Sequence, residues 1–173
     1  QKNGDVAILD LNALRMNHGG RLVPSKIIAE EIASEKWDII GIGGLTTTYS
    51  RIKSLAPLIR KHSPDSIFIA GGGWCSYNPA EILQLVPELD LICIGEGEET
   101  FSEFYDIVSA GQKDFEDVNG LCIRENDNFK FTQPRALISN LDTVPYPAYD
   151  LLELDIYFRY SSLPYSVESF NSK

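Results

Sequence analysis

The sequence predicts an α/β fold: a Rossmann-like (flavodoxin-like) doubly wound parallel sheet, followed by a small C-terminal β-hairpin and a linker. Three observations predict it: short runs that are apolar throughout, amphipathic segments between them, and glycine clusters where three of the runs end. Strands without polar alternation, separated by helices, are typical of a parallel sheet covered on both faces. A chain of 173 residues is long enough for one such domain with a small appendage.

Strands and helices are predicted to alternate from the start of the chain. Val6–Leu11 is a short apolar run and the first predicted strand. The segment 24–37 opens with Pro24, which favours a helix start, and continues with isoleucines at helical spacing. Further strands are predicted at 38–45, 66–73 and 90–95, and further helices at 50–62, 78–86 and 98–111.

The pattern changes near the end of the last of these helices. The segment 118–133 predicts a β-hairpin that turns at Asp127 and Asn128. A tail with several prolines and no clear periodicity follows, and we interpret it as a linker or docking arm. The predicted division is therefore an α/β domain at 1–116, a hairpin appendage at 117–136 and a linker at 137–173.

The first residues indicate that the sheet begins upstream. Residues 1–5 resemble the end of a helix that runs into the second strand of a doubly wound sheet. We therefore expect the first strand and its helix to precede residue 1. Since a missing central strand leaves backbone groups of its neighbours unpaired, we expect compensation by a homodimer through exposed strand edges, a rearrangement or another segment.

Composition excludes several classes of partner. The chain has 15 basic and 25 acidic residues, a net charge of −10, which argues against nucleic acid and anionic membranes as partners. Its apolar runs are shorter than a membrane span, and we expect no secretory signal. Cys75, Cys93 and Cys122 are far apart and match no metal-ligand spacing, so we expect reduced thiols, in the core or near the surface, in a cytoplasmic protein.

The predicted ligand site lies at the carboxyl ends of three strands. In open parallel sheets, ligands bind beyond these ends. Glycine or hydroxyl residues are concentrated in three such segments, 41–50, 70–78 and 95–101. Loops from neighbouring strands would form one rim of backbone amides and hydroxyl groups. A tight turn also favours glycine, so a purely structural role stays open at this point.

Phosphate binding and nucleophilic catalysis find little support in the sequence. No loop has the lysine of a P-loop, and residues 95–100 supply only the first two glycines of the dinucleotide fingerprint. Glu96 and Glu98 would repel a pyrophosphate, whereas acidic residues suit the start of a helix and can cap its amides. His18 and His62, the two histidines, belong to no nucleophile–base pattern. Trp74 is either a packing aromatic or a wall against a flat ligand.

The segment 38–104 resembles the cobalamin-binding domain at the N-terminus of many radical S-adenosylmethionine enzymes. That family shows a strand ending in glycine, a Thr/Ser-rich loop, a Gly-Gly pair and a GEGE motif; here Gly71-Gly72 and the segment 95–98 match the last two. The tail 138–152 is similar to the segment that joins this domain to its catalytic barrel. The Ser-x-Leu motif of the wider cobalamin-binding family aligns with 43–45, where glycine replaces the serine.

The resemblance implies a cobalamin-binding module of a larger enzyme of methyltransferase or oxidative cyclase type. Its partner would be a C-terminal radical S-adenosylmethionine barrel, which holds a [4Fe–4S] cluster in a CxxxCxxC loop that this sequence lacks. We therefore expect no activity from this chain alone, assign no catalytic or metal residue, and place a lower axial histidine, if the parent has one, upstream. The implied cobalamin-binding residues are Gly43, Gly44, Leu45, Thr46, Thr47, Thr48, Gly71, Gly72, Gly73, Trp74, Gly95, Glu96, Gly97 and Glu98.

An alternative hypothesis keeps the architecture but not the cofactor. A flavodoxin-like or receiver-like binding or docking domain would share the doubly wound sheet without binding cobalamin. In a receiver domain, Asp10 would be the candidate phosphorylation site at a strand end, but the lysine partner is not evident.

Overall fold

The computed structural model describes residues 4–126 and 128–160, and these cluster into two compact units. One unit, which we call the sheet unit, covers 25–144. The other combines the described residues 4–24 and 145–160, and contains α1 (Leu11–Asn17), η3 (Tyr149–Leu151) and α7 (Leu154–Tyr160). The units do not follow the predicted division at 116/117 and 136/137, because the hairpin belongs with the sheet.

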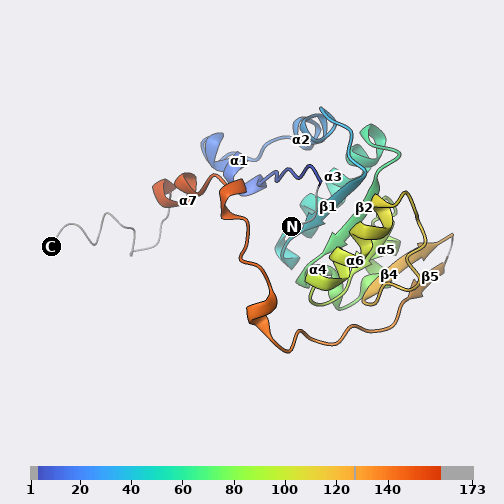
Figure 1. The fold of residues 1–173 in the computed structure, drawn as a ribbon. Helices are drawn as coiled ribbons and strands as arrows, with labels where there is room; N and C mark the ends of the chain where they lie inside the picture. Colours follow the sequence, from blue (N-terminus) through green and yellow to red (C-terminus); the bar gives the residue numbers. More distant parts are fainter. Residues whose placement is uncertain (1–3, 127, 161–173) are drawn as a thin grey trace. The chain divides into compact units, whose positions relative to one another are not determined.

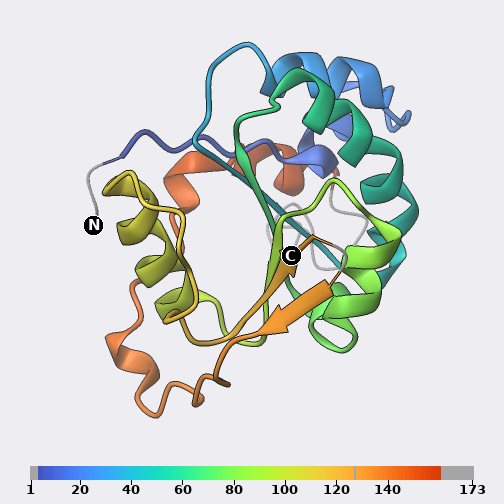
Figure 2. The same cartoon turned by 90° about the vertical axis from the view of Figure 1, so that its right-hand side faces the viewer.

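The sheet unit has helices on both sides of a five-stranded mixed sheet (Figure 1). Its elements are α2 (Ser25–Ile32), β1 (Ile39–Gly43), η1 (Thr46–Thr48), α3 (Tyr49–His62), β2 (Ile67–Gly71), α4 (Gly73–Ser76), α5 (Pro79–Leu85), β3 (Leu91–Cys93), α6 (Glu98–Ser109), β4 (Leu121–Glu125), β5 (Asn128–Phe131) and η2 (Leu141–Thr143). The strand order is β1-β2-β3-β4-β5, with β1, β2 and β3 parallel and the hairpin strands antiparallel. Figure 2 shows α6 on one side of the sheet and α3 and α5 on the other. The predicted α/β fold class is confirmed.

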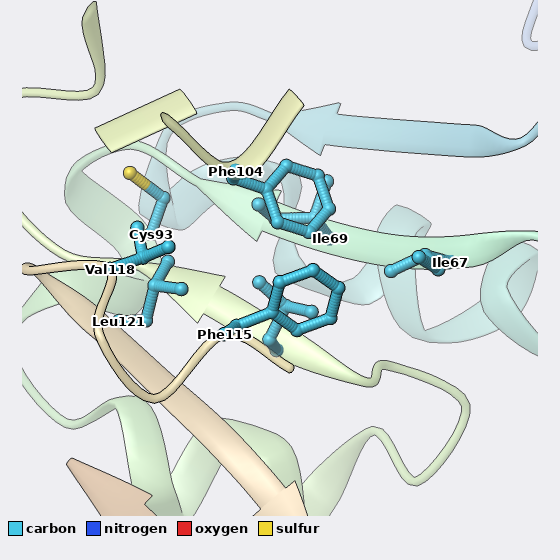
Figure 3. Packing of buried hydrophobic residues seen from close by; sticks show 8 residues of the cluster. Ile67, Ile69, Cys93, Phe104, Phe115, Val118 and Leu121 are labelled. Atoms are coloured by element: carbon cyan, nitrogen blue, oxygen red, sulfur yellow. The ribbon is translucent and has the colours of Figure 1, made fainter. Parts of the chain in front are cut away.

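Successive residues of β2 point to opposite faces of the sheet, and those from Ile67 to Ala70 are all buried, so the core has a layer on each face. Ile67 and Ile69 belong to the cluster that also contains Phe104 of α6 and Phe115 from the following loop (Figure 3). The rings of Phe104 and Phe115 are 4.9 Å apart between centroids, and Phe104 is fully buried. This packing fixes α6 over the sheet and thereby fixes the loop that leads into it.

The hairpin completes the sheet instead of forming an appendage. β4 runs antiparallel to β3, and its residues Leu121 and Cys122 are fully buried. Arg124 donates from Nε to the carbonyl oxygen of Leu89 at 3.1 Å, and its guanidinium also reaches the carbonyl of Leu83. An apolar strand beside the last parallel strand covers an edge that would otherwise expose unpaired backbone groups.

The prediction of a strand at Val6–Leu11 is wrong for this structure. Gly4 to Asp10 form no strand, and Leu11 already begins α1, which the Asp10 side chain caps by accepting from the amides of Asn12 and Ala13. A strand needs a neighbour for its backbone hydrogen bonds. Every strand pairing among the described residues involves positions from Ile39 onward, so this apolar run has no such neighbour.

The ends of β1 and β2 bring two backbone segments close together. Gly72 has φ +93° and ψ 177°, a conformation essentially restricted to glycine. A Cβ atom on Gly72 would lie 3.2 Å from the carbonyl oxygen of Gly44. Gly44 has a similar restriction, since its Cβ would clash with the Thr48 hydroxyl. These two glycines are therefore required by the fold itself.

Replacing Arg124 tests the attachment of the hairpin. Arg124→Ala removes charge-assisted bonds to carbonyls at the end of α5 and leaves those carbonyls partly unpaired, so the free energy of unfolding falls by about 2 kcal/mol. Urea unfolding followed by circular dichroism measures the change. Lys113→Ala, at an exposed loop position, is the control and leaves the stability nearly unchanged. Equal losses in the two variants would contradict this role.

A second prediction compares the stability of alanine variants at two neighbouring glycines, Gly72 and Gly73. Gly72→Ala forces an unfavourable backbone conformation and a contact with Gly44, so we expect it to cost about 1–3 kcal/mol of stability. Gly73→Ala, where a Cβ meets nothing within 4 Å, stays neutral or gains about 0.5 kcal/mol. Thermal unfolding midpoints of the two variants give the answer, and similar shifts in both would exclude the proposed strain.

Candidate functional site

Three strand ends and the start of α6 line an open pocket of about 570 Å³ within the sheet unit. Glycines from β1, from the end of β2 and from the loop after β3 contribute much of its wall. Its lining residues are Gly41, Ile42, Gly43, Ile69, Ala70, Gly71, Gly72, Cys93, Gly95, Gly97, Glu98 and Phe101.

Strand register explains why these residues meet. β1 and β2 are parallel and in a register that pairs Gly41 with Ile69 and Gly43 with Gly71. Alternate residues of a strand face the same side, so positions 41 and 43 leave one face of the sheet bare near its carboxyl edge. Phe101 of α6, which is 41% exposed, lines the pocket from the helix. The result is a hollow of backbone and apolar side chains.

The pocket carries little charge or reactivity. Burial raises the pKa of the Cys93 thiol, so this thiol is neutral at neutral pH and is a poor nucleophile. Glu98 is the ionisable carboxylate of the lining, and the Ser76 hydroxyl accepts from the amide of Gly95 at 3.3 Å. No group of metal-ligating side chains is found among residues 4–126 and 128–160. A lining of backbone and apolar side chains suits the binding of a largely uncharged group.

Six of the fourteen residues predicted to bind the ligand line this pocket: Gly43, Gly71, Gly72, Gly95, Gly97 and Glu98. The other eight lie around it without lining it: Gly44, Leu45, Thr46, Thr47, Thr48, Gly73, Trp74 and Glu96. Thr46 to Thr48 form η1, where the Thr48 hydroxyl donates to the carbonyl oxygen of Leu45 at 2.6 Å. These eight residues remain candidates for the part of a ligand that extends beyond the pocket.

Trp74 has a packing role in the structure. Its side chain is 7% exposed, and its Nε1 donates to the carbonyl oxygen of Gly71 at 3.0 Å. Its ring lies 6.2 Å from that of Tyr49, centroid to centroid. Of the two roles that the sequence left open, these contacts favour the packing aromatic.

The prediction missed six lining residues: Gly41, Ile42, Ile69, Ala70, Cys93 and Phe101. For Gly41 a signal existed, since it precedes Gly43 by two positions and so shares its face of the strand. Phe101 follows Gly97 by four positions, one helical turn. Cys93 could not be assigned from sequence because its position relative to the pocket depends on the register between strands.

The glutamates after β3 have partners that the sequence did not indicate. The N-cap of α6 is Gly97, which has no side chain to cap the helix, while Glu98 and Glu99 lie in the first turn, where a negative charge is favourable to the helix dipole. Glu96 accepts instead from the backbone amide of Ile138 at 2.7 Å. Glu99 pairs with Arg135 at 3.2 Å.

Other candidate groups are already engaged. The Tyr157 hydroxyl donates to Asp10, with 2.5 Å between the oxygens, and Asp10 also caps α1. These two bonds disfavour Asp10 as a free phosphorylation site.

All three cysteines are free and buried, which places the expected thiols in the core. Burial raises the pKa of Cys75 to about 12 and that of Cys122 to about 11.

In the part of the chain that the structure describes, no helix is long and apolar enough to cross a membrane.

The sequence matches a known family over most of this architecture. The family described as B12 binding domain matches residues 1–105. This range includes all three glycine-rich strand ends and the first part of α6.

Curated relatives share sequence across nearly the whole chain. An uncharacterized methyltransferase of Pyrococcus horikoshii is 31% identical over 140 residues, which cover 81% of this chain and 30% of the relative. The anaerobic magnesium-protoporphyrin IX monomethyl ester cyclase of Synechocystis is 28% identical over 157 residues, 90% of this chain and 30% of the relative. The chain thus spans about 30% of the length of these two proteins.

Solved structures share the fold. OxsB, a cobalamin-dependent S-adenosylmethionine radical enzyme solved with aqua-cobalamin and S-adenosylmethionine bound, gives a TM-score of 0.61 at 24% identity, over 74% of this chain and 18% of OxsB. TsrM from Kitasatospora setae, a radical S-adenosylmethionine methyltransferase solved with cobalamin and a [4Fe–4S] cluster bound, gives 0.60 at 15% identity, over 78% of this chain and 30% of TsrM. Since the family match covers more than half of the sequence, this chain belongs to the B12-binding domain family, whose ligand is cobalamin.

Proposed function

We propose that this chain is the cobalamin-binding module of a larger radical S-adenosylmethionine enzyme, of methyltransferase or cyclase type. In that enzyme it would hold the cofactor for a catalytic domain located in another part of the protein. The relatives are named as a methyltransferase and a cyclase, and the chain corresponds to a minor part of each. The bound cofactor would supply a cobalt centre able to carry an alkyl group, whereas the residues of this chain bind and orient it.

Glycines that the fold does not require carry this proposal. At Gly41 a Cβ would lie 4.0 Å from Ile69 Cγ2, and at Gly71 it would lie 3.9 Å from Cys93 Cβ. Both are ordinary van der Waals distances, and neither glycine has a positive φ, in contrast to Gly72. An alanine would therefore fit the protein at these positions. The lack of a side chain at Gly41 and Gly71 is explained by a ligand that occupies the space next to them.

The size and chemistry of the pocket fit one arm of the cofactor. A volume of about 570 Å³ is typical of small-molecule sites, and the lining is apolar apart from Glu98 and backbone groups. We assign it to the nucleotide tail, whose flat base would pack between the bare strands and Phe101. The corrin would then extend past the strand ends, toward the hydroxyls of η1, which can accept from its amide groups.

A homodimer through strand edges stays a proposal. β1 is the outermost strand of the sheet, and no described strand pairs with its outer edge. A long unpaired edge favours pairing with another strand, from a second copy or from a segment upstream in the parent protein. Sedimentation of the chain at several concentrations measures whether a dimer forms.

Filling the pocket tests the proposed function. The chain is mixed with hydroxocobalamin, separated from free cofactor on a desalting column, and the visible absorbance that elutes with protein is recorded. We expect near-stoichiometric corrin absorbance for the unaltered chain. Gly41→Val should weaken binding about tenfold or more, or about 1.4 kcal/mol, while Gly41→Ala, with a single methyl group in ordinary contact, has a smaller effect.

Unfolding midpoints of the variants provide the control. Because a Cβ at position 41 is in ordinary contact only, Gly41→Ala should unfold close to the midpoint of the unaltered chain, and the midpoint of Gly41→Val separates a loss of binding from a loss of stability. A colourless eluate from the unaltered chain, or equal binding by all three proteins, would contradict the assignment.

A further inference from the structure

The segment 133–139, which we call the strap, leaves β5 and crosses the start of α6. Its first residue is held by the sheet, since the Gly120 amide donates to the carbonyl oxygen of Gln133 at 2.8 Å. Two further attachments tie it to α6 and to the loop before that helix. The proposed function uses neither of them.

Arg135 makes the first attachment. Its side chain is only 11% exposed, and its Nε donates to Thr100 Oγ1 at 2.8 Å. The two terminal nitrogens of the guanidinium donate to Glu99 at 3.2 Å and to Glu103. The three acceptors lie on the first two turns of α6, so the strap is fixed to this part of the helix.

Glu96 makes the second attachment, at the rim of the pocket. Glu96 lies between Gly95 and Gly97, which both line the pocket, and its Oε2 accepts from the amide of Ile138 at 2.7 Å. A bond to a carboxylate is stronger than one between neutral groups. Glu96 is thus oriented away from the lining and holds the strap.

The Arg135 attachment also reaches the pocket. Thr100, which is fully buried, donates to the carbonyl oxygen of Asn119 at 3.0 Å, and its hydroxyl lowers the pKa of the Cys93 thiol against the larger effect of burial. Cys93 lines the pocket. Both attachments therefore connect the strap, directly or through one residue, to atoms beside the proposed ligand.

We propose that Glu96 is a positioning residue that couples occupancy of the cobalamin pocket to the order of the strap, which Arg135 attaches to α6. This inference rests on the proposed function. A ligand that packs against Gly95 and Gly97 restricts the loop between them, and so favours the bond from Ile138 to Glu96. Coupling is reciprocal, so a change that breaks this bond weakens cobalamin binding by the same factor.

The test combines binding with hydrogen exchange on the full chain. The dissociation constant for hydroxocobalamin is measured by visible absorbance, and amide exchange of Ile138 is followed with and without the cofactor. For the unaltered chain, we expect cobalamin to slow Ile138 exchange about fivefold or more. Exchange of Phe68, a buried amide of β2, serves as the internal reference for overall stability.

Cobalamin binding by three variants tests whether the Glu96 carboxylate carries the coupling. Glu96→Ala removes the acceptor and should weaken cobalamin binding about fivefold or more. Glu96→Gln keeps an oxygen acceptor and should restore part of the affinity, which a general loss of stability would not do. Glu35→Ala removes a glutamate from an exposed turn and should bind like the unaltered chain.

The outcomes separate this inference from the proposed function. If the unaltered chain does not bind cobalamin, both fail. If it binds while Ile138 exchange stays the same and Glu96→Ala binds equally well, only the coupling is overturned. If Glu96→Ala binds more weakly although cobalamin leaves Ile138 exchange unchanged, Glu96 contacts the ligand directly and the coupling is again overturned.

Discussion

The absence of side chains at the ends of three neighbouring strands is the constraint on which the rest of the structure depends. Gly72 is a glycine because it adopts a positive φ and lies close to the backbone of Gly44, and Gly44 is a glycine because a Cβ there would clash with the Thr48 side chain. Gly41 and Gly71 have room for a Cβ. The same sequence feature thus has two physical causes, one in folding and one in ligand binding, and the available space at each position distinguishes them.

The acidic residues after β3 are compatible with this site because much of their charge is engaged elsewhere. Glu99 and Glu103 share Arg135, and Glu96 accepts from a backbone amide. Glu98 remains at the pocket, where a carboxylate can accept from the amide groups of a largely uncharged ligand but would repel a phosphate-rich one. The net charge of −10 agrees with a cofactor that needs no basic surface.

Much of the fold could be predicted from the sequence, because apolar runs and helical periodicity are local signals. The parallel strands at 38–45, 66–73 and 90–95 and the two strands of the hairpin belong to this class. The predicted turn position is not confirmed, because Asn128 is the first residue of β5 and Asp127 lies outside the described residues. Contacts between distant segments could not be predicted. The pairing of β4 with β3, the attachment of Ile138 to Glu96 and the isolation of the run at Val6–Leu11 all depend on which elements become neighbours in space.

The most direct test of the account is a titration of the chain with hydroxocobalamin, followed by the amide resonances of its glycines in nuclear magnetic resonance spectra. The account predicts changes at Gly41, Gly43 and Gly71, on the bare face of the sheet, with Gly111 at the end of α6 unaffected. Changes confined to glycines outside the pocket, with those three unmoved at saturation, would show that cobalamin binds elsewhere and would contradict the account.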